Sequence, residues 1–73
     1  MNPALELIID YIKSEINIQS QLVEHAHMMS ENSESNYVSG LWAGLKIGHE
    51  ATIRELNSIL KLAEELTNGT TKE

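Results

Sequence analysis

A single polar stretch near the middle of the chain, residues 30–36 with the sequence SENSESN, constrains the fold more than any other feature. It separates two segments that are each long enough to form a helix. The first segment opens with Asn2 and Pro3, a capping residue followed by the residue type best tolerated at the first helical position. The polar stretch is typical of a loop, in which Ser33 or Ser35 would cap the second helix.

These signals predict one all-α domain made of two helices. The helices are expected over about residues 3–30 and 36–67, with a loop at about 31–35. Asn68 and Gly69 are a typical helix-ending pair, so residues 68–73 are expected to form a frayed tail. Because a short loop joins two long helices, the predicted arrangement is an antiparallel helical hairpin.

The apolar residues of both segments cover more surface than one hairpin can bury. On a helical wheel, the apolar residues of the first segment fill an arc wider than one partner helix covers. The first half of the second segment, residues 37–53, is apolar or small nearly all round. A chain of 73 residues without cysteine cannot use disulfides to compensate. We therefore expect self-association into a four-helix bundle, as a homodimer or a higher homo-oligomer.

The charge of the chain argues against several kinds of partner. Eleven acidic residues against five basic ones give a formal net charge of −6. Such a surface repels nucleic acids and anionic membranes. No apolar run approaches the roughly 20 residues of a membrane span, and the N-terminus carries acids where a secretory signal would carry bases. The sequence favours a cytoplasmic location, with no nucleic-acid or membrane partner.

Three glycines spaced by four, Gly40, Gly44 and Gly48, lie inside the second predicted helix. Each costs roughly 1 kcal/mol relative to alanine, so another interaction must offset them. One interpretation is close helix packing, with the packing residues Gly40, Gly44, Gly48, Ala51, Leu41 and Leu45. The other is a shallow groove for a flat ligand, with contacts drawn from Tyr37, Trp42, Lys46 and Arg54.

The pattern Tyr37-x-x-Gly40-x-x-x-Gly44-x-x-x-Gly48-x-x-Ala51, running into Leu56-x-x-Ile59-Leu60, resembles the second helix of small phage or prophage proteins of helical-hairpin type. The resemblance covers about a third of the chain. It implies a compact accessory protein, often one that disarms or modulates a host factor. It transfers no site residues.

Glu15, Gln19 and His49 fall on the apolar arcs of the two segments. Pairing the helices about the loop places Gln19 level with Ile47 and puts His49 at nearly the same height. A buried carboxylate needs a partner, which His49 could provide for Glu15. The three residues are expected to form a polar layer that fixes helix register, or else a ligand or proton site. Since no nucleophile or phosphate-binding loop accompanies them, an enzyme is not expected.

Glu24 and His27 have the Glu-x-x-His spacing of metal sites in helical bundles. In the pairing about the loop, Trp42 and Ser39 lie opposite them, and neither is a carboxylate. No metal or cofactor is therefore expected. Two functions remain open: a non-enzymatic interaction protein that binds and modulates a host protein, and an oligomer that traps a nucleotide-like ligand in a glycine-lined groove between subunits.

Overall fold

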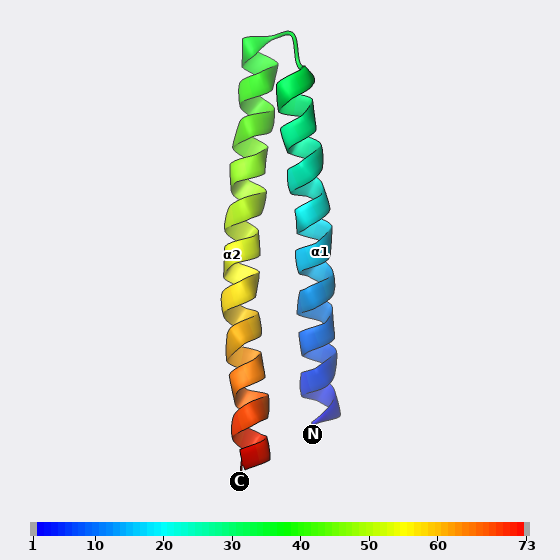
Figure 1. Ribbon diagram of the computed structural model, residues 1–73, viewed down its shortest axis with the longest axis vertical. Helices are drawn as coiled ribbons and strands as arrows, with labels where there is room; N and C mark the ends of the chain where they lie inside the picture. Colours follow the sequence, from blue (N-terminus) through cyan, green and yellow to red (C-terminus); the bar gives the residue numbers. More distant parts are fainter. Residues whose placement is uncertain (1, 73) are drawn as a thin grey trace.

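The computed structural model describes the backbone of residues 2–72 and the side chains of residues 2–68. It contains helix α1, Pro3–Asn32, and helix α2, Asn36–Lys72, which run antiparallel side by side (Figure 1). The molecule is a rod with extents of 58 × 15 × 12 Å. The predicted all-α helical hairpin is confirmed, and the described residues contain no strand.

The helix starts follow the capping signals of the sequence. The Asn2 side chain accepts a hydrogen bond from the Ala4 amide at 2.9 Å, next to Pro3 in the first turn of α1. At the start of α2, the Ser35 hydroxyl accepts from the Val38 amide at 3.4 Å. Ser35, rather than Ser33, is therefore the capping residue. The connection between the helices is as short as an antiparallel hairpin requires.

Both helices extend further than the sequence signals predicted. Helix α1 ends at Asn32 instead of about Ser30, and α2 runs to Lys72 instead of about Thr67. The backbone of residues 68–72 is thus helical, beyond the expected end of the second helix. Asparagine and glycine lower helix propensity without forbidding the helical conformation, and no proline follows them to end the helix.

The contact between the helices follows a regular line of residues, which we call the seam. Seam residues are buried or half-buried and alternate at spacings of three and four, the pattern of a coiled coil. On α1 they are Leu5, Ile9, Ile12, Ile16, Gln19, Val23, Ala26 and Ser30. On α2 they are Ser39, Trp42, Lys46, His49, Ile53, Leu56, Leu60, Ala63 and Thr67.

Two polar contacts fix the register of the seam. Near the loop, the Ser30 hydroxyl donates to the Ser39 carbonyl at 3.0 Å, and the Ser39 hydroxyl donates to the Ser30 carbonyl at 2.8 Å. Further from the loop, Gln19 of α1 forms a hydrogen bond with His49 of α2. Because antiparallel α-helices rise equally per residue, continuing this register towards the termini pairs Ile16 with Ile53, Ile12 with Leu56, Ile9 with Leu60 and Leu5 with Ala63.

The hairpin buries little by itself. Among the described residues, only Ile12, Ala26 and Ala63 have buried side chains. The Cα radius of gyration is 16.7 Å, whereas a compact domain of this length would have about 11 Å. One seam between two helices therefore leaves most of the apolar arcs predicted from the sequence exposed to solvent.

Candidate interaction surface

Most of the exposed large apolar side chains lie beside the seam on one flank of each helix. On α1, Ile8, Leu22 and Met29 each precede a seam residue by one position. On α2, Val38, Leu45, Ile59 and Leu66 do the same. A second row also precedes seam residues by one position but lies further round each helix from the partner helix. It consists of Tyr11 and Ile18 on α1, and Leu41 and Leu62 on α2.

These two flanks lie on the same face of the hairpin. A residue one position before the seam is rotated by about 100° from it around the helix axis. The two helices run in opposite directions and present their seams to each other, so this rotation carries both flanks to the same side. We call this side the apolar face. Exposed Leu7, Met28, Tyr37 and Ile47 lie outside it.

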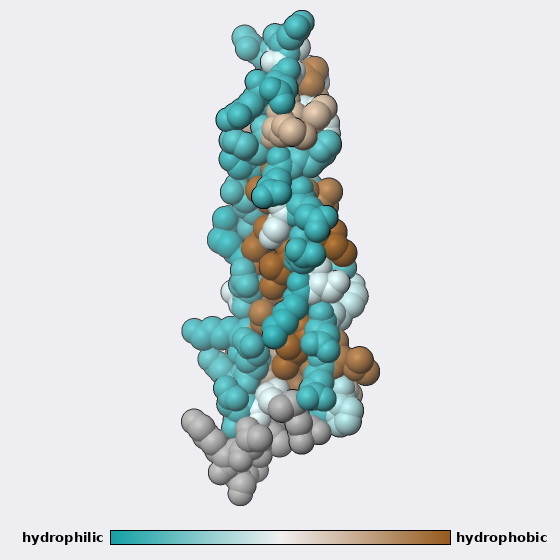
Figure 2. Space-filling view, turned by 45° about the vertical axis from the view of Figure 1, so that its right-hand side comes forward, coloured by the Kyte–Doolittle hydropathy of each residue, from teal (hydrophilic) through white to brown (hydrophobic). Residues whose placement is uncertain are grey.

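The opposite face is polar. It carries Glu6, Asp10 and Lys13 of α1 beside Glu64 of α2, around a hollow that Ile9, Thr67 and Asn68 also line. In Figure 2, hydrophilic side chains cover most of the visible surface, while hydrophobic ones show through the middle and project along the right-hand edge. Most of the exposed apolar residues and most of the charged residues therefore lie on different faces of a thin rod.

The glycines do not pack against α1. Gly40, Gly44 and Gly48 are exposed, and a Cβ atom built on any of them would meet no other atom within 4 Å. Within one hairpin, close helix packing at the glycines was therefore wrong, because the observed seam passes along another side of α2. Gly44 and Gly48 instead line a shallow open hollow with Leu41, Leu45, His49 and Thr52, which we call the glycine groove.

None of the four residues suggested as ligand contacts lines the glycine groove. Tyr37 and Arg54 are exposed elsewhere on α2. Trp42 is a half-buried seam residue whose ring meets that of His25 edge-on, with centroids 5.4 Å apart. Lys46 is also in the seam and points to His27. The lining of the glycine groove therefore includes no lysine or arginine.

The structure brings together two of the three residues of the expected polar layer. Gln19 Oε1 lies 2.8 Å from His49 Nδ1, and both side chains are half-buried. Since the amide oxygen can only accept, His49 Nδ1 is the donor. Glu15 is also half-buried, but its side chain makes no hydrogen bond or ion pair with another described residue. The expected Glu15–His49 contact was wrong, because Gln19 occupies the seam position facing His49.

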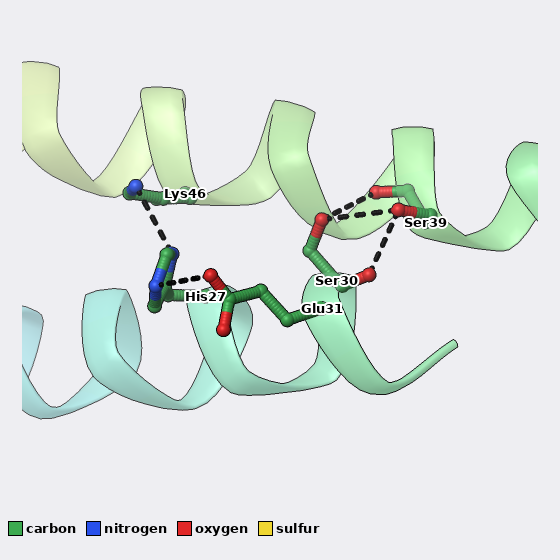
Figure 3. Close-up of polar contacts among 5 residues, drawn as sticks. All are labelled: His27, Ser30, Glu31, Ser39 and Lys46. Carbon is green, nitrogen blue, oxygen red and sulfur yellow. Dashed lines mark hydrogen bonds and ion pairs between the residues drawn. The ribbon is translucent and has the colours of Figure 1, made fainter. Parts of the chain in front are cut away.

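A second polar group lies near the loop on the polar face (Figure 3). Lys46 Nζ lies 3.3 Å from His27 Nδ1, and His27 Nε2 lies 3.0 Å from a Glu31 carboxylate oxygen. His27 therefore connects the two helices through Lys46, and it also contacts Glu31 in the last turn of α1. Glu24 is not part of this group. Over residues 2–68, no cluster of three or more His, Asp or Glu residues could hold a metal ion.

The seam pattern was present in the sequence but was hidden by the flanking apolar residues. Residues such as Leu22 and Leu45 stand directly before seam residues and widen the apolar arcs, so the wheel alone does not place polar Lys46 and Ser39 in the seam. The strict alternation of three and four through Leu5, Ile9, Ile12 and Ile16 was the signal that could have located the seam.

No helix within the described part of the chain has the length and apolarity needed to cross a membrane. Comparisons of the chain with protein-family models, with curated proteins and with solved structures found no match.

Proposed function

We propose that this protein is a non-enzymatic interaction protein whose hairpins associate into a four-helix bundle and whose assembly binds and modulates another protein. The observation that carries this proposal is the apolar face. Exposed side chains such as Leu22, Leu41 and Leu45 lie together beside the seam on this face. Exposed apolar regions of this kind mark protein–protein contacts.

The use of the polar side chains supports a non-enzymatic role. His49 bonds with Gln19, and Ser30 bonds with Ser39 across the helices. His27 lies between Lys46 and Glu31. Each of these groups bridges the two helices or stabilises a helix end, and so contributes to the register of the hairpin. These histidine and serine side chains are thus used in contacts that hold the hairpin together.

The proposed partner outside the assembly is a host protein, as in the phage-type accessory proteins that the Tyr37–Leu60 pattern resembles. The expected location is the cytoplasm. A nucleotide-like ligand is less well supported, because the glycine groove is lined by Leu41, Leu45, His49 and Thr52 without a lysine or arginine. A phosphate group would lack a cationic partner there.

Native mass spectrometry of protein purified from cells tests this proposal. We expect an assembly of at least twice the 8.2 kDa chain mass, without a bound small molecule. A monomer at micromolar concentration would contradict the proposed self-association. An added mass of a few hundred daltons per assembly, retained under native and lost under denaturing conditions, would favour ligand sequestration instead.

A further inference from the structure

We infer that the apolar face docks on the apolar face of a second copy of this chain, with the glycine groove of α2 as the place of closest approach. The inference rests on the self-association proposed above and adds the surface through which it occurs. The alternatives are a contact through the polar face, or through the exposed residues Leu7, Met28, Tyr37 and Ile47.

The exposed area has the size that one such contact would remove. The hairpin exposes 5458 Å². Size scaling of monomeric proteins gives about 4,500 Å² for a compact chain of 8.2 kDa. The excess of roughly 950 Å² is close to the roughly 800 Å² per partner that a standard stable interface buries. One face-to-face contact between two hairpins therefore brings each chain to the exposed area of an ordinary globular protein.

The distribution of charge allows two acidic chains to meet on this face. Glu6, Asp10 and Glu64 lie around the hollow of the polar face, and His27 and Glu31 lie near its other end. Contact through the apolar faces directs these acids into solvent on opposite sides of the assembly. Among the described side chains, the acidic and basic ones on the apolar face are Glu15 beside the seam, and His25 and Glu55 in the outer row.

The face also has the self-complementary shape that a two-fold contact requires. In such a contact the same patch serves both partners, so it must carry projections as well as hollows. Leu22 and Leu45 project beside the seam, whereas Gly44 and Gly48 leave the adjoining surface without side chains. Because a Cβ at either glycine would meet nothing within one hairpin, the space is open to a side chain of the second copy.

A matched pair of charge substitutions tests the location of the contact. Leu45 is 50% exposed on the apolar face, and Ile47 is 65% exposed on the other side of α2. Leu45→Glu should raise the dissociation constant of the dimer at least about tenfold and shift the mass in sedimentation velocity towards 8.2 kDa. Ile47→Glu should leave the dimer intact, with circular dichroism checking that each variant stays helical.

The other outcomes separate this inference from the proposed function. If both variants stay dimeric, if both dissociate, or if only Ile47→Glu dissociates, the apolar face is not the interface, although self-association stands. If the unsubstituted protein is itself monomeric, self-association fails and the docking surface fails with it.

Thiol labelling covers the case in which Leu45→Glu does not fold. The chain contains no cysteine, so Leu41→Cys and Ile47→Cys each introduce one reporter. Leu41 and Ile47 are 53% and 65% exposed in the hairpin, so the monomer should react with a maleimide at similar rates at both positions. In the assembled protein, Leu41→Cys should react at least about tenfold more slowly, since a contact excludes water and reagent. Equal rates would overturn the inference.

Discussion

The half of the seam near the chain termini and the half near the loop are held together by different chemistry. Towards the termini, Ile9, Ile12 and Ile16 of α1 fill the seam together with Ile53, Leu56 and Leu60 of α2. Towards the loop, the seam contains Gln19 with His49 and Ser30 with Ser39, and also Lys46. The helices run without a break through both halves.

The two halves should therefore contribute differently, the terminal half mainly to stability and the loop half mainly to the register of the helices. Complete burial of an isoleucine or leucine side chain contributes roughly 1.5–3 kcal/mol, whereas a typical hydrogen bond contributes about 0.5–1.5 kcal/mol net. The terminal half should therefore supply most of the free energy of unfolding. The loop half supplies contacts that only one register satisfies, and its outer surface carries the glycine groove.

The largest expected effect is in the terminal half, at Ile12, whose side chain is 5% exposed. Ile12→Ala should lower the free energy of unfolding by about 2–4 kcal/mol, because it removes buried methylene groups and leaves a cavity. Urea unfolding followed by circular dichroism measures the change. Ile47→Ala is the matched control and should change stability by less than about 0.5 kcal/mol, since Ile47 is exposed outside the apolar face. Equal losses would show that the hairpin is paired differently.

A smaller loss is expected in the loop half at Gln19. Gln19→Ala removes the acceptor 2.8 Å from His49 Nδ1 and should cost about 1–2 kcal/mol, because a half-buried donor loses its partner. Gln21→Ala, on an exposed position of the same helix, should cost little. A double-mutant cycle with His49→Ala isolates the pairwise term. A coupling near zero would mean that water replaces the contact, and the loop half would then lack this specific interaction.

The existence and order of the helices followed from the sequence, because the signals for them are local. Pro3 and the polar loop act within a few residues, and each was sufficient to place a helix end to within a few positions. The end of α2 was missed because Asn68 and Gly69 weaken a helix without breaking it.

The register of the two helices and the exposure of the glycines could not be derived from such local signals. Both depend on which line of residues faces the partner helix, and apolar residues such as Leu22 and Leu45 compete with the true seam for that position. Pairing about the loop placed Gln19 level with Ile47, whereas it bonds with His49. Since successive helical residues differ by 100° around the axis, a small error in register moves the glycines from a packed side to an exposed one.

Gly44→Ala should stabilise the free hairpin but weaken the association between copies. In the free hairpin the added methyl meets no atom within 4 Å, so alanine should stabilise the protein by up to about 1 kcal/mol. In the assembly the same methyl occupies the glycine groove and should weaken association. Thermal melts at low and high protein concentration measure both terms.

Gly40→Ala is the control for this experiment, because Gly40 is exposed but does not line the glycine groove. It should raise the melting temperature at both concentrations. If Gly44→Ala behaves in the same way, with unchanged association, the glycine groove has no part in the contact between copies.

The smallest expected effect concerns the charged group at the loop end. Glu31 accepts from His27 at 3.0 Å, but the two side chains are 67% and 50% exposed, so water and salt screen the pair. Glu31→Gln should therefore lower stability by at most about 0.5 kcal/mol, as exposed ion pairs usually do. Glu24→Gln removes the same charge from the same helix without removing a contact observed for His27. The difference between the two variants, measured by urea unfolding at low and high salt, isolates the His27 contact from the change in net charge. A difference above about 1 kcal/mol would show that Lys46, His27 and Glu31 act as a cooperative network. In that case the loop half would contribute to stability as well as to register, and the contrast between the two halves of the seam would be weaker.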